Sequence, residues 1–198
     1  LDAAYRLSFV NGATHNSNGI TFNGTTQYAN TFLLSSSIAN VSTGAFAIYN
    51  RTNNAVAGVD IGTQDIAIGN TRNYVIAAKW SDNNLYGRIG LQSIQVTGTN
   101  SDASGLYVTT RTSTTSLKVF RNGTQFGSTV TTTNTQDAPS QNIFIGAQNA
   151  SNLGGAAFYT NRNYCFVSIF NTGLSDSESA TASSLINTLQ TALGRNTY

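Results

Sequence analysis

The chain has 198 residues and little charge: Asp, Glu, Lys and Arg make up 9% of it, against about 25% in an average soluble protein. Its composition includes 28 Thr, 24 Asn, 21 Ser and 18 Gly instead, so hydroxyl and amide groups must form most of the surface. The net charge is +2, and the ten Lys and Arg residues are scattered along the chain without a cluster, which argues against a nucleic-acid partner. No apolar run is long enough to span a membrane.

A hydrophobic fraction of 39%, with ten Phe and nine Tyr, is enough to fill a sizeable core. Because β-sandwiches of this length commonly fold as one unit, we expect residues 1–198 to form a single domain. A neutral polar surface costs less to desolvate than a charged one. It therefore suits either close packing against other proteins or hydrogen bonding to sugars.

Apart from its C-terminal end, the chain consists of short apolar segments separated by clusters of Asn, Gly, Ser and Thr, which is the pattern of strands and turns. Strands with almost no helix between them cannot form a parallel sheet, because parallel neighbours need a crossover connection. The prediction is an all-β, antiparallel sandwich. The predicted strands cover residues 5–10, 19–23, 27–33, 44–51, 55–61, 65–69, 73–80, 85–90, 92–97, 105–111, 116–121, 124–130, 141–147 and 164–170.

The strongest turn signal lies in residues 116–128, where Asn122 and Gly123 separate two strands. This pair suits a two-residue type I′ turn, whose central positions both need a positive φ. In the hairpin that this turn creates, we expect Val119 and Phe126 to form a cross-strand pair on the side of the core. The turn predicts the pairs Arg121 with Thr124, Val119 with Phe126, and Leu117 with Ser128.

A second hairpin is expected to join residues 73–80 to 85–90 through a turn at 81–84. The segment KWSDNNLYGR, 79–88, is also the one stretch that indicates a ligand surface. Its aromatic rings could stack on a sugar, and its short polar side chains could bind hydroxyl groups. The candidate carbohydrate-binding residues are Trp80, Asp82, Asn83, Asn84 and Tyr86.

The core is the alternative place for Trp80. In a continuous strand Trp80 shares a side with Tyr74, Ile76 and Ala78, because side chains alternate between the two faces. These neighbours are apolar, so the strand pattern favours a buried tryptophan over a sugar-stacking one.

The C-terminal segment predicts a helix from about residue 175 to 193, which is expected to cover an edge or a face of a sheet. Ser175 and Glu178 have the spacing of a capping box, in which each side chain binds the backbone N–H of the other residue. Glu178, the only glutamate, is thus interpreted as a helix cap rather than a catalytic acid. Gly194 follows where a left-handed residue ends a helix. The apolar residues that share one helix face are Ala182, Leu185, Ile186, Leu189 and Leu193.

No catalytic or metal-binding set is recognisable in the sequence. A glycoside hydrolase usually needs two carboxylates about 5 to 10 Å apart, and here the acids are dispersed. His15 is interpreted as a solvated loop residue and Cys165 as a small hydrophobic one, so neither a catalytic triad nor a zinc site is expected. Calcium bound by carbonyls and an aspartate stays open. The acids are Asp2, Asp60, Asp65, Asp82, Asp102, Asp137, Asp176 and Glu178.

Several stretches resemble parts of LamG-like, or concanavalin A-like, jelly-roll domains: the early strand pair, the signature hairpin, the strand after it, and the terminal strand with its helix. Such domains are common in bacteriophage structural proteins and in bacterial proteins. The resemblance implies a jelly-roll sandwich with one C-terminal helix. The stretches are SNGITFNGTTQYANT (17–31), LKVFRNGTQFGS (117–128), NIFIGAQN (142–149) and the closing run 165–196.

The resemblance implies no particular activity, because the fold hosts lectins, enzymes and inert virion components. An arrangement that resembles the E-x-D-x-x-E of sandwich glucanases is missing, so we expect no enzymatic activity and no cofactor. The leading hypothesis is a structural or attachment protein of a phage virion, such as a capsid decoration, head fibre or tail fibre module. Its partners would be other virion proteins and host glycans, and a dimer or trimer would suit such a role. The alternative is a secreted or cell-surface carbohydrate-binding module of a bacterium.

Overall fold

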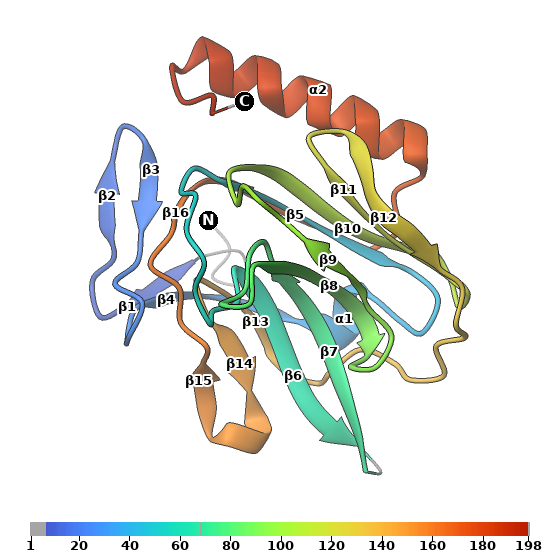
Figure 1. The fold of residues 1–198 in the computed structure, drawn as a ribbon. Coiled ribbons are helices and arrows are strands. Elements are labelled where there is room, and N and C mark those ends of the chain that lie inside the picture. Colours follow the sequence, from blue (N-terminus) through green and yellow to red (C-terminus); the bar gives the residue numbers. More distant parts are fainter. Residues whose placement is uncertain (1–6, 68, 198) are drawn as a thin grey trace.

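Two stacked β-sheets form the body of the protein in the computed structural model, which describes residues 7–67 and 69–197 (Figure 1). The nine-stranded sheet contains, in order across it, β1 (Ser8–Val10), β4 (Tyr28–Leu34), β13 (Asn142–Ile145), β6 (Ile61–Ala67), β7 (Asn70–Ala77), β8 (Asn84–Leu91) and β9 (Val96–Thr99), with β14 (Gln148–Ala150) and β15 (Gly155–Ala157) beside this path. The seven-stranded sheet contains β12 (Thr124–Val130), β11 (Ser116–Arg121), β10 (Gly105–Ser113), β5 (Gly44–Asn50), β16 (Asn163–Phe170), β3 (Gly19–Thr21) and β2 (Thr14–Asn16). The described helices are α1 (Ser35–Ile38), the 3-10 helix η2 (Ser151–Leu153) and α2 (Asp176–Ala192). A jelly-roll sandwich with a long C-terminal helix confirms the predicted fold class.

Neighbouring strands run antiparallel, as predicted, with one exception among the described strands. β14 runs parallel to β6, with Gln148 opposite Gly62. β13 pairs antiparallel with the same strand, with Phe144 opposite Gly62. The chain therefore reverses direction between β13 and β14, where Gly146 has a φ of 80°. A tight reversal produces this parallel contact, and no crossover helix is needed.

Some of the predicted strand positions are confirmed and others are wrong. Strands 116–121 and 124–130 are confirmed to the residue as β11 and β12. Two segments are wrong: residues 55–60 form no strand, and residues 92–95 form a turn and connection before β9. Of the predicted strand 65–69, residues 65–67 are the end of the longer β6, residue 68 lies outside the described residues, and Gly69 lies in a turn. The other predicted strands overlap observed ones, and their ends differ by three residues at most.

Residues 55–60 form no strand despite their apolar composition. Val59 donates its N–H to the carbonyl of Phe158 at 2.8 Å, and Asp60 donates to that of Ile76 at 2.9 Å. The backbone hydrogen bonds of residues 59 and 60 thus go to two separate segments and not to one neighbouring strand. Within this segment only residues 58–60 are buried, whereas Ala55 and Ala57 are exposed, so its apolar composition indicates neither a strand nor uniform burial.

The short elements are the ones that the sequence pattern does not predict. β2, β14 and β15 have three residues each, too few to show an alternation of apolar and polar side chains. His15 consequently lies in β2 and not in a loop as predicted, with its ring edge-on to Phe9 at 4.5 Å between centroids. Of the predicted strand 5–10, the first two residues lie outside the described residues.

The core lies between the two sheets and takes side chains from both. The seven-stranded sheet contributes Ile48 and Tyr107, and the nine-stranded sheet contributes Ile76 and Leu85. All seven residues of β5 are buried. Alternate side chains of a strand point to opposite faces, so the outer face of this sheet must be covered as well.

Helix α2 provides that cover (Figure 1). Its Ile186 packs with Ala47, Tyr49 and Val108 on the outer face of the seven-stranded sheet. The prediction that the terminal helix covers a sheet is therefore confirmed.

The helix does not use its leucine row for this contact. Its buried residues are Ser179, Ser183, Ile186 and Gln190, whereas the exposed fractions of Leu185, Leu189 and Leu193 are 67%, 47% and 49%. An amphipathic helix normally buries its apolar stripe, so the sequence pattern indicates the wrong face.

Anchors at the two ends of α2 explain its rotation. At the start, Thr110 Oγ1 accepts from the N–H of Leu174 at 2.7 Å and donates to the Leu174 carbonyl at 2.9 Å. At the far end, Arg51 Nε donates to the Arg195 carbonyl at 2.9 Å, and the Tyr49 hydroxyl donates to Asn196. With both ends fixed, small serines face the sheet and the leucines face outward.

The predicted helix signals are confirmed. Ser175 Oγ accepts from the N–H of Glu178 at 3.3 Å, and Glu178 Oε2 accepts from the N–H of Ser175 at 2.8 Å. The Ser175 hydroxyl also donates to Glu178 Oε2 at 2.7 Å, and this bond, together with the one from the Ser175 N–H, lowers the pKa of Glu178. Gly194 follows the helix with a φ of 66°. The carboxylate of the only glutamate is thus engaged at a helix end and is exposed.

The hairpin of β11 and β12 is also confirmed at its turn. Asn122 and Gly123 have φ values of 52° and 82°, as a type I′ turn requires. Two of the three predicted pairs are correct, but Leu117 faces Val130 and not Ser128. The register shifts after the Val119 pair, where Gly127 adopts a φ of 65° and lets β12 bulge.

Replacing Ser175 by alanine removes an acceptor for a first-turn N–H, and we expect a loss of about 1 kcal/mol in the free energy of unfolding. Urea denaturation followed by circular dichroism measures this loss. Ser184→Ala is the matched control, because Ser184 is exposed in the middle of the same helix, where alanine favours the helical state. Equal unfolding midpoints for Ser175→Ala and the wild type would contradict the capping role.

Candidate functional site

A cavity of about 380 Å³ opens on the outer face of the nine-stranded sheet, the face that α2 does not cover. It combines an apolar floor, three aromatic rings, four glutamines and one arginine. The lining residues are Val59, Gln64, Val75, Ala77, Trp80, Tyr86, Arg88, Gln92, Gln95, Gln148 and Phe158.

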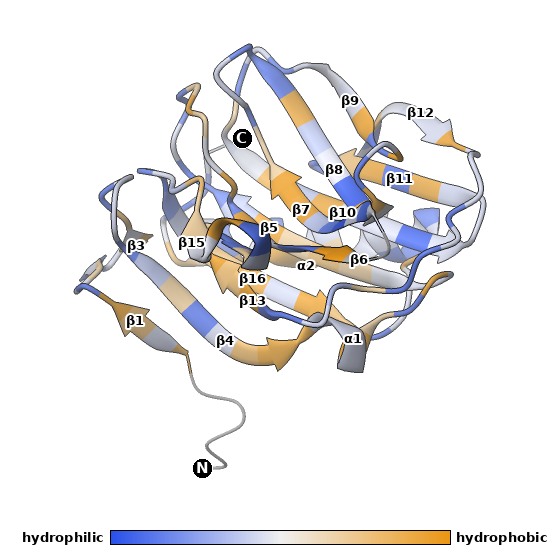
Figure 2. Cartoon of the chain, turned by 90° about the horizontal axis from the view of Figure 1, so that it is seen from below, coloured by the Kyte–Doolittle hydropathy of each residue, from blue (hydrophilic) through white to orange (hydrophobic). Residues whose placement is uncertain are grey.

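Strand alternation explains which side chains reach this face. In β8, Leu85 and Ile89 point into the core, so Tyr86 and Arg88 point outward into the cavity. Figure 2 shows hydrophilic and hydrophobic residues alternating along β8. β8 therefore presents polar side chains to the cavity, β7 contributes Val75 and Ala77 to its apolar floor, and the other side of both strands fills the core.

Trp80 lies on the cavity side, so the prediction that it shares the core with Tyr74, Ile76 and Ala78 is wrong. The strand pattern fails because β7 ends at Ala77. The chain then turns, and the N–H of Trp80 donates to the Asn84 carbonyl at 2.7 Å. The alternation of faces no longer applies beyond the strand end.

Two further rings complete an aromatic wall. The Trp80 ring lies 5.6 Å from that of Phe158 and 6.4 Å from that of Tyr86, between centroids. Phe158 is 37% exposed and has a φ of 52°. Such strained positions persist only where the surroundings hold them, and here the Phe158 carbonyl accepts from Val59 at 2.8 Å. Sequence reasoning missed Phe158, whose one signal is a large aromatic residue in a stretch of glycines and alanines.

The polar lining is partly fixed by hydrogen bonds. Arg88 Nε donates to Gln95 Oε1 at 2.7 Å, and the Arg88 guanidinium carbon lies 5.0 Å from the Tyr86 ring centroid. Gln64 donates to Asn152 at 2.8 Å. The Arg88 side chain is thus held by a ring on one side and an amide on the other.

A second hollow of about 450 Å³ adjoins the cavity and shares three of its residues, Arg88, Gln92 and Gln95. Its other lining residues include Asn70 and Thr71 from β7. The two hollows together form one groove with a polar junction at these three residues.

The five candidate sugar-binding residues divide into two groups. Trp80 and Tyr86 line the cavity, and Asp82, Asn83 and Asn84 do not. Asp82 accepts the Tyr86 hydroxyl at 2.7 Å and the Asn84 N–H at 2.9 Å, and the Tyr86 bond is the main cause of its lowered pKa. Asn83 takes a φ of 65° in the turn. The three turn residues thus shape the hairpin, and Asp82 orients Tyr86.

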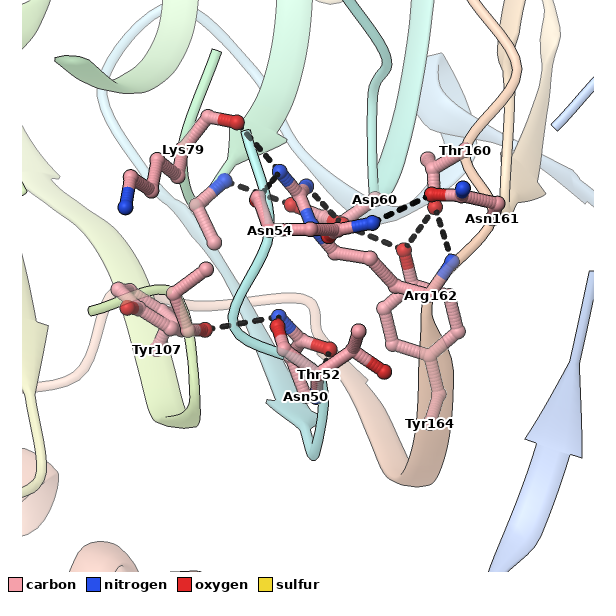
Figure 3. A network of polar contacts seen from close by, with 12 residues as sticks. Asn50, Thr52, Asn54, Asp60, Lys79, Tyr107, Thr160, Asn161, Arg162 and Tyr164 are labelled. Atoms are coloured by element: carbon pink, nitrogen blue, oxygen red, sulfur yellow. Dashed lines mark hydrogen bonds and ion pairs between the residues drawn. The ribbon is translucent and has the colours of Figure 1, made fainter. Parts of the chain in front are cut away.

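A buried polar network, drawn in Figure 3, includes residues that lie close to Trp80 and Phe158 in the chain, such as Lys79 and Thr160. Asp60 and Arg162 form an ion pair of 2.7 Å, and both side chains are fully buried. Arg162 also donates to the carbonyls of Asn54, at 2.9 Å, and Lys79. Asp60 accepts the N–H of Ala78 at 2.6 Å. The ion pair therefore binds the backbone directly before Trp80.

The same network holds the segment that follows Phe158. The Tyr164 hydroxyl donates to Asp60 and lies 2.6 Å from the Thr160 hydroxyl. Burial alone would lower the pKa of Arg162, but the charge of Asp60 raises it above its ordinary value. Arg162 consequently stays charged and keeps both wall segments in place.

The described acids outside this network also have structural partners. Among residues 7–67 and 69–197, no group of three or more His, Cys, Asp or Glu side chains could hold a metal ion. Cys165 is half-buried beside Phe166, and burial raises the pKa of its thiol to about 11. The acid contacts are Asp65 with Arg72, Asp102 with Arg121, Asp176 with Lys118, and Asp137 with the N–H of Val41.

None of the helices within the described ranges is both long and apolar enough to cross a membrane.

Comparisons with known proteins show the fold alone. No protein-family model matches the chain, and no curated protein matches it. Among solved structures it is similar to a mutant Trypanosoma rangeli sialidase with trans-sialidase activity, with 16% identity, a TM-score of 0.63, and coverage of 95% of this chain and 30% of that one. It is also similar to a mutant of HCR/D, with 8% identity, a TM-score of 0.60, and coverage of 91% of this chain and 47% of that one. The chain thus spans less than half the length of these neighbours.

Replacing Asp60 by asparagine leaves Arg162 as a buried charge without a counter-ion, and we expect a loss of about 3 to 5 kcal/mol in the free energy of unfolding. Asp102→Asn is the matched control, because its ion pair with Arg121 is partly exposed, and it should lose about 1 kcal/mol or less. Trp80 is the only tryptophan, so its emission spectrum reports the wall directly. If Asp60→Asn and Asp102→Asn had the same Trp80 emission spectrum and the same free energy of unfolding, the anchoring role of Asp60 would be refuted.

Proposed function

We propose that the protein is a glycan-binding module without enzymatic activity, and that the cavity beside Trp80 is its binding site. The observation that carries this proposal is the wall of Trp80, Phe158 and Tyr86 next to four glutamine side chains. Concave sites of a few hundred cubic ångströms that combine apolar walls with a few polar groups are typical of small-ligand binding.

The chemistry of the lining matches that of a sugar. The C–H face of a pyranose ring packs on an aromatic ring by apolar contact. A glutamine amide has two N–H donors and one carbonyl acceptor, which matches the mixed donor and acceptor character of hydroxyl groups. Gln64, Gln95 and Gln148 each use one of these groups in a hydrogen bond within the protein, so their remaining groups are the ones that can meet a ligand. Gln92 lies between the cavity and the second hollow, where one amide can serve two neighbouring sugar units.

The arrangement of the acids supports binding without catalysis. Among the described lining residues of the cavity, none is Asp, Glu, His or Cys. Hydrolysis of a glycosidic bond usually uses two carboxyl groups on either side of that bond. The nearest candidate from the sequence, Asp82, is occupied by the Tyr86 hydroxyl and by the turn.

The solved neighbours add modest support. Trypanosoma rangeli sialidase is described in complex with sialic acid, at a TM-score of 0.51 and coverage of 28% of that chain. The fold is thus found in a protein that engages a sugar. The enzymatic activity of that longer protein is not transferred to this chain, because the match covers less than a third of that protein.

The biological setting that we propose first is a phage virion, in which the module contacts host glycans and other virion proteins. The exposed row of Leu185, Leu189 and Leu193 favours protein contacts, because exposed leucines along a helix are costly in water. The second setting that we propose is a bacterium, which would carry the module on its cell surface or secrete it. Mass spectrometry of purified virions from the source should detect the chain in many copies per particle, and its absence would leave the bacterial setting.

Removing the aromatic wall should weaken binding. On a glycan array followed by titration of the strongest ligand, we expect Trp80→Ala and Phe158→Ala each to lower the affinity by at least about tenfold, as truncation of a central aromatic contact does. Phe32→Ala is the matched control, because Phe32 is an exposed aromatic residue of the same sheet that does not line the cavity. An array without any ligand, or equal affinities of all four proteins, would overturn the proposal.

A further inference from the structure

Arg88 is the one charged residue among the described residues that line the cavity and the second hollow. It lies at the point that the two hollows share, next to Gln92 and Gln95. In a protein with so few charges, a cation at the centre of a polar groove requires an explanation.

Arg88 has no acidic partner in the described chain, in contrast to the four cations that form ion pairs. Its Nε donates to Gln95 at 2.7 Å, and its two terminal nitrogens have no hydrogen-bond partner within the described residues. The ion pairs of the described residues are Asp65 with Arg72, Asp102 with Arg121, Asp60 with Arg162, and Asp176 with Lys118.

The guanidinium is also partly withdrawn from water. It is half-buried over the Tyr86 ring, and burial lowers the pKa of Arg88, although an arginine stays protonated at neutral pH. A partly desolvated charge without a counter-ion is unfavourable. An anion bound in the groove would remove this cost, so the site is better suited to a charged ligand than to a neutral one.

The geometry narrows the kind of anion. The bond from Nε to Gln95 and the contact with Tyr86 fix the plane of the guanidinium. The two terminal N–H groups then form a planar pair of donors, which a planar carboxylate accepts through both oxygens. Asp82 supports this arrangement indirectly, since it holds the Tyr86 hydroxyl at 2.7 Å.

We propose that the groove binds an acidic saccharide, a glycan whose sugar units carry carboxylate groups, with the carboxylate on Arg88 and a sugar ring against Trp80. This inference rests on the proposed glycan-binding function and specifies its ligand class. Because the second hollow also reaches Arg88, the neighbouring sugar unit lies there. Arg88 is then the residue that selects acidic over neutral glycans.

Matched ligands test the charge directly. The probes are a galacturonan oligosaccharide and its fully methyl-esterified form, 3′-sialyllactose and lactose, and a sulfated dextran oligosaccharide. The emission of Trp80 reports binding, because it is the only tryptophan and lines the cavity. The proteins are the wild type, Arg88→Gln and Arg88→Lys, with Arg121→Gln as a charge-matched control outside the groove. Unfolding midpoints verify that each variant is folded.

We expect the wild type to bind at least one carboxylated ligand about tenfold more tightly than its neutral counterpart, which is the effect of about 1.4 kcal/mol. Arg88→Gln should remove this preference, Arg88→Lys should restore only part of it because it lacks the planar pair of donors, and Arg121→Gln should keep it. Equal binding of acidic and neutral partners, or an unchanged preference in Arg88→Gln, would overturn the inference while the proposed function stands. Tighter binding of the sulfated probe would overturn the assignment to a carboxylate, and no binding of any probe in this set or on the array would overturn both proposals.

Discussion

The cavity depends on one buried interaction, the ion pair between Asp60 and Arg162. Two charges removed from water are tolerated only if their remaining hydrogen-bonding groups find partners. Here those partners are backbone groups of irregular segments: the carbonyls of Asn54 and Lys79 and the N–H of Ala78. A backbone group can satisfy the pair only while its segment keeps one position. The ion pair thus fixes segments that no strand ladder holds.

The two sheets use their outer faces differently. Helix α2 covers the seven-stranded sheet, so the outer side chains of β5 become part of a second apolar cluster. No described helix covers β7 and β8 of the nine-stranded sheet (Figure 1), and their outer side chains line the groove. Arg88, which forms no ion pair in the described chain, is the one charged residue among those that line the groove. The sandwich therefore has one structural face and one face available to a ligand.

Features that depend on near neighbours could be predicted from the sequence. The turn at Asn122 and Gly123 follows from the φ values that a two-residue hairpin requires, and the helix start follows from Ser175 and Glu178, which are three residues apart. The fold class follows from many short strands without crossover helices. In each case the determining contacts lie within a few residues of one another, so local composition contains the information.

The position of the site was decided by tertiary structure. Trp80 lies in the cavity because β7 ends three residues before it, and Phe158 completes the wall through a backbone contact with Val59, 99 positions away in the chain. The unpaired state of Arg88 depends on where every acid is placed. Likewise, α2 turns its leucines outward because anchors beyond both ends fix its rotation. The sequence by itself determined most of the longer elements and the side-chain pairs next to a turn. Long-range contacts decided where strands end, which face the helix buries and which distant side chains meet, because periodicity specifies none of these.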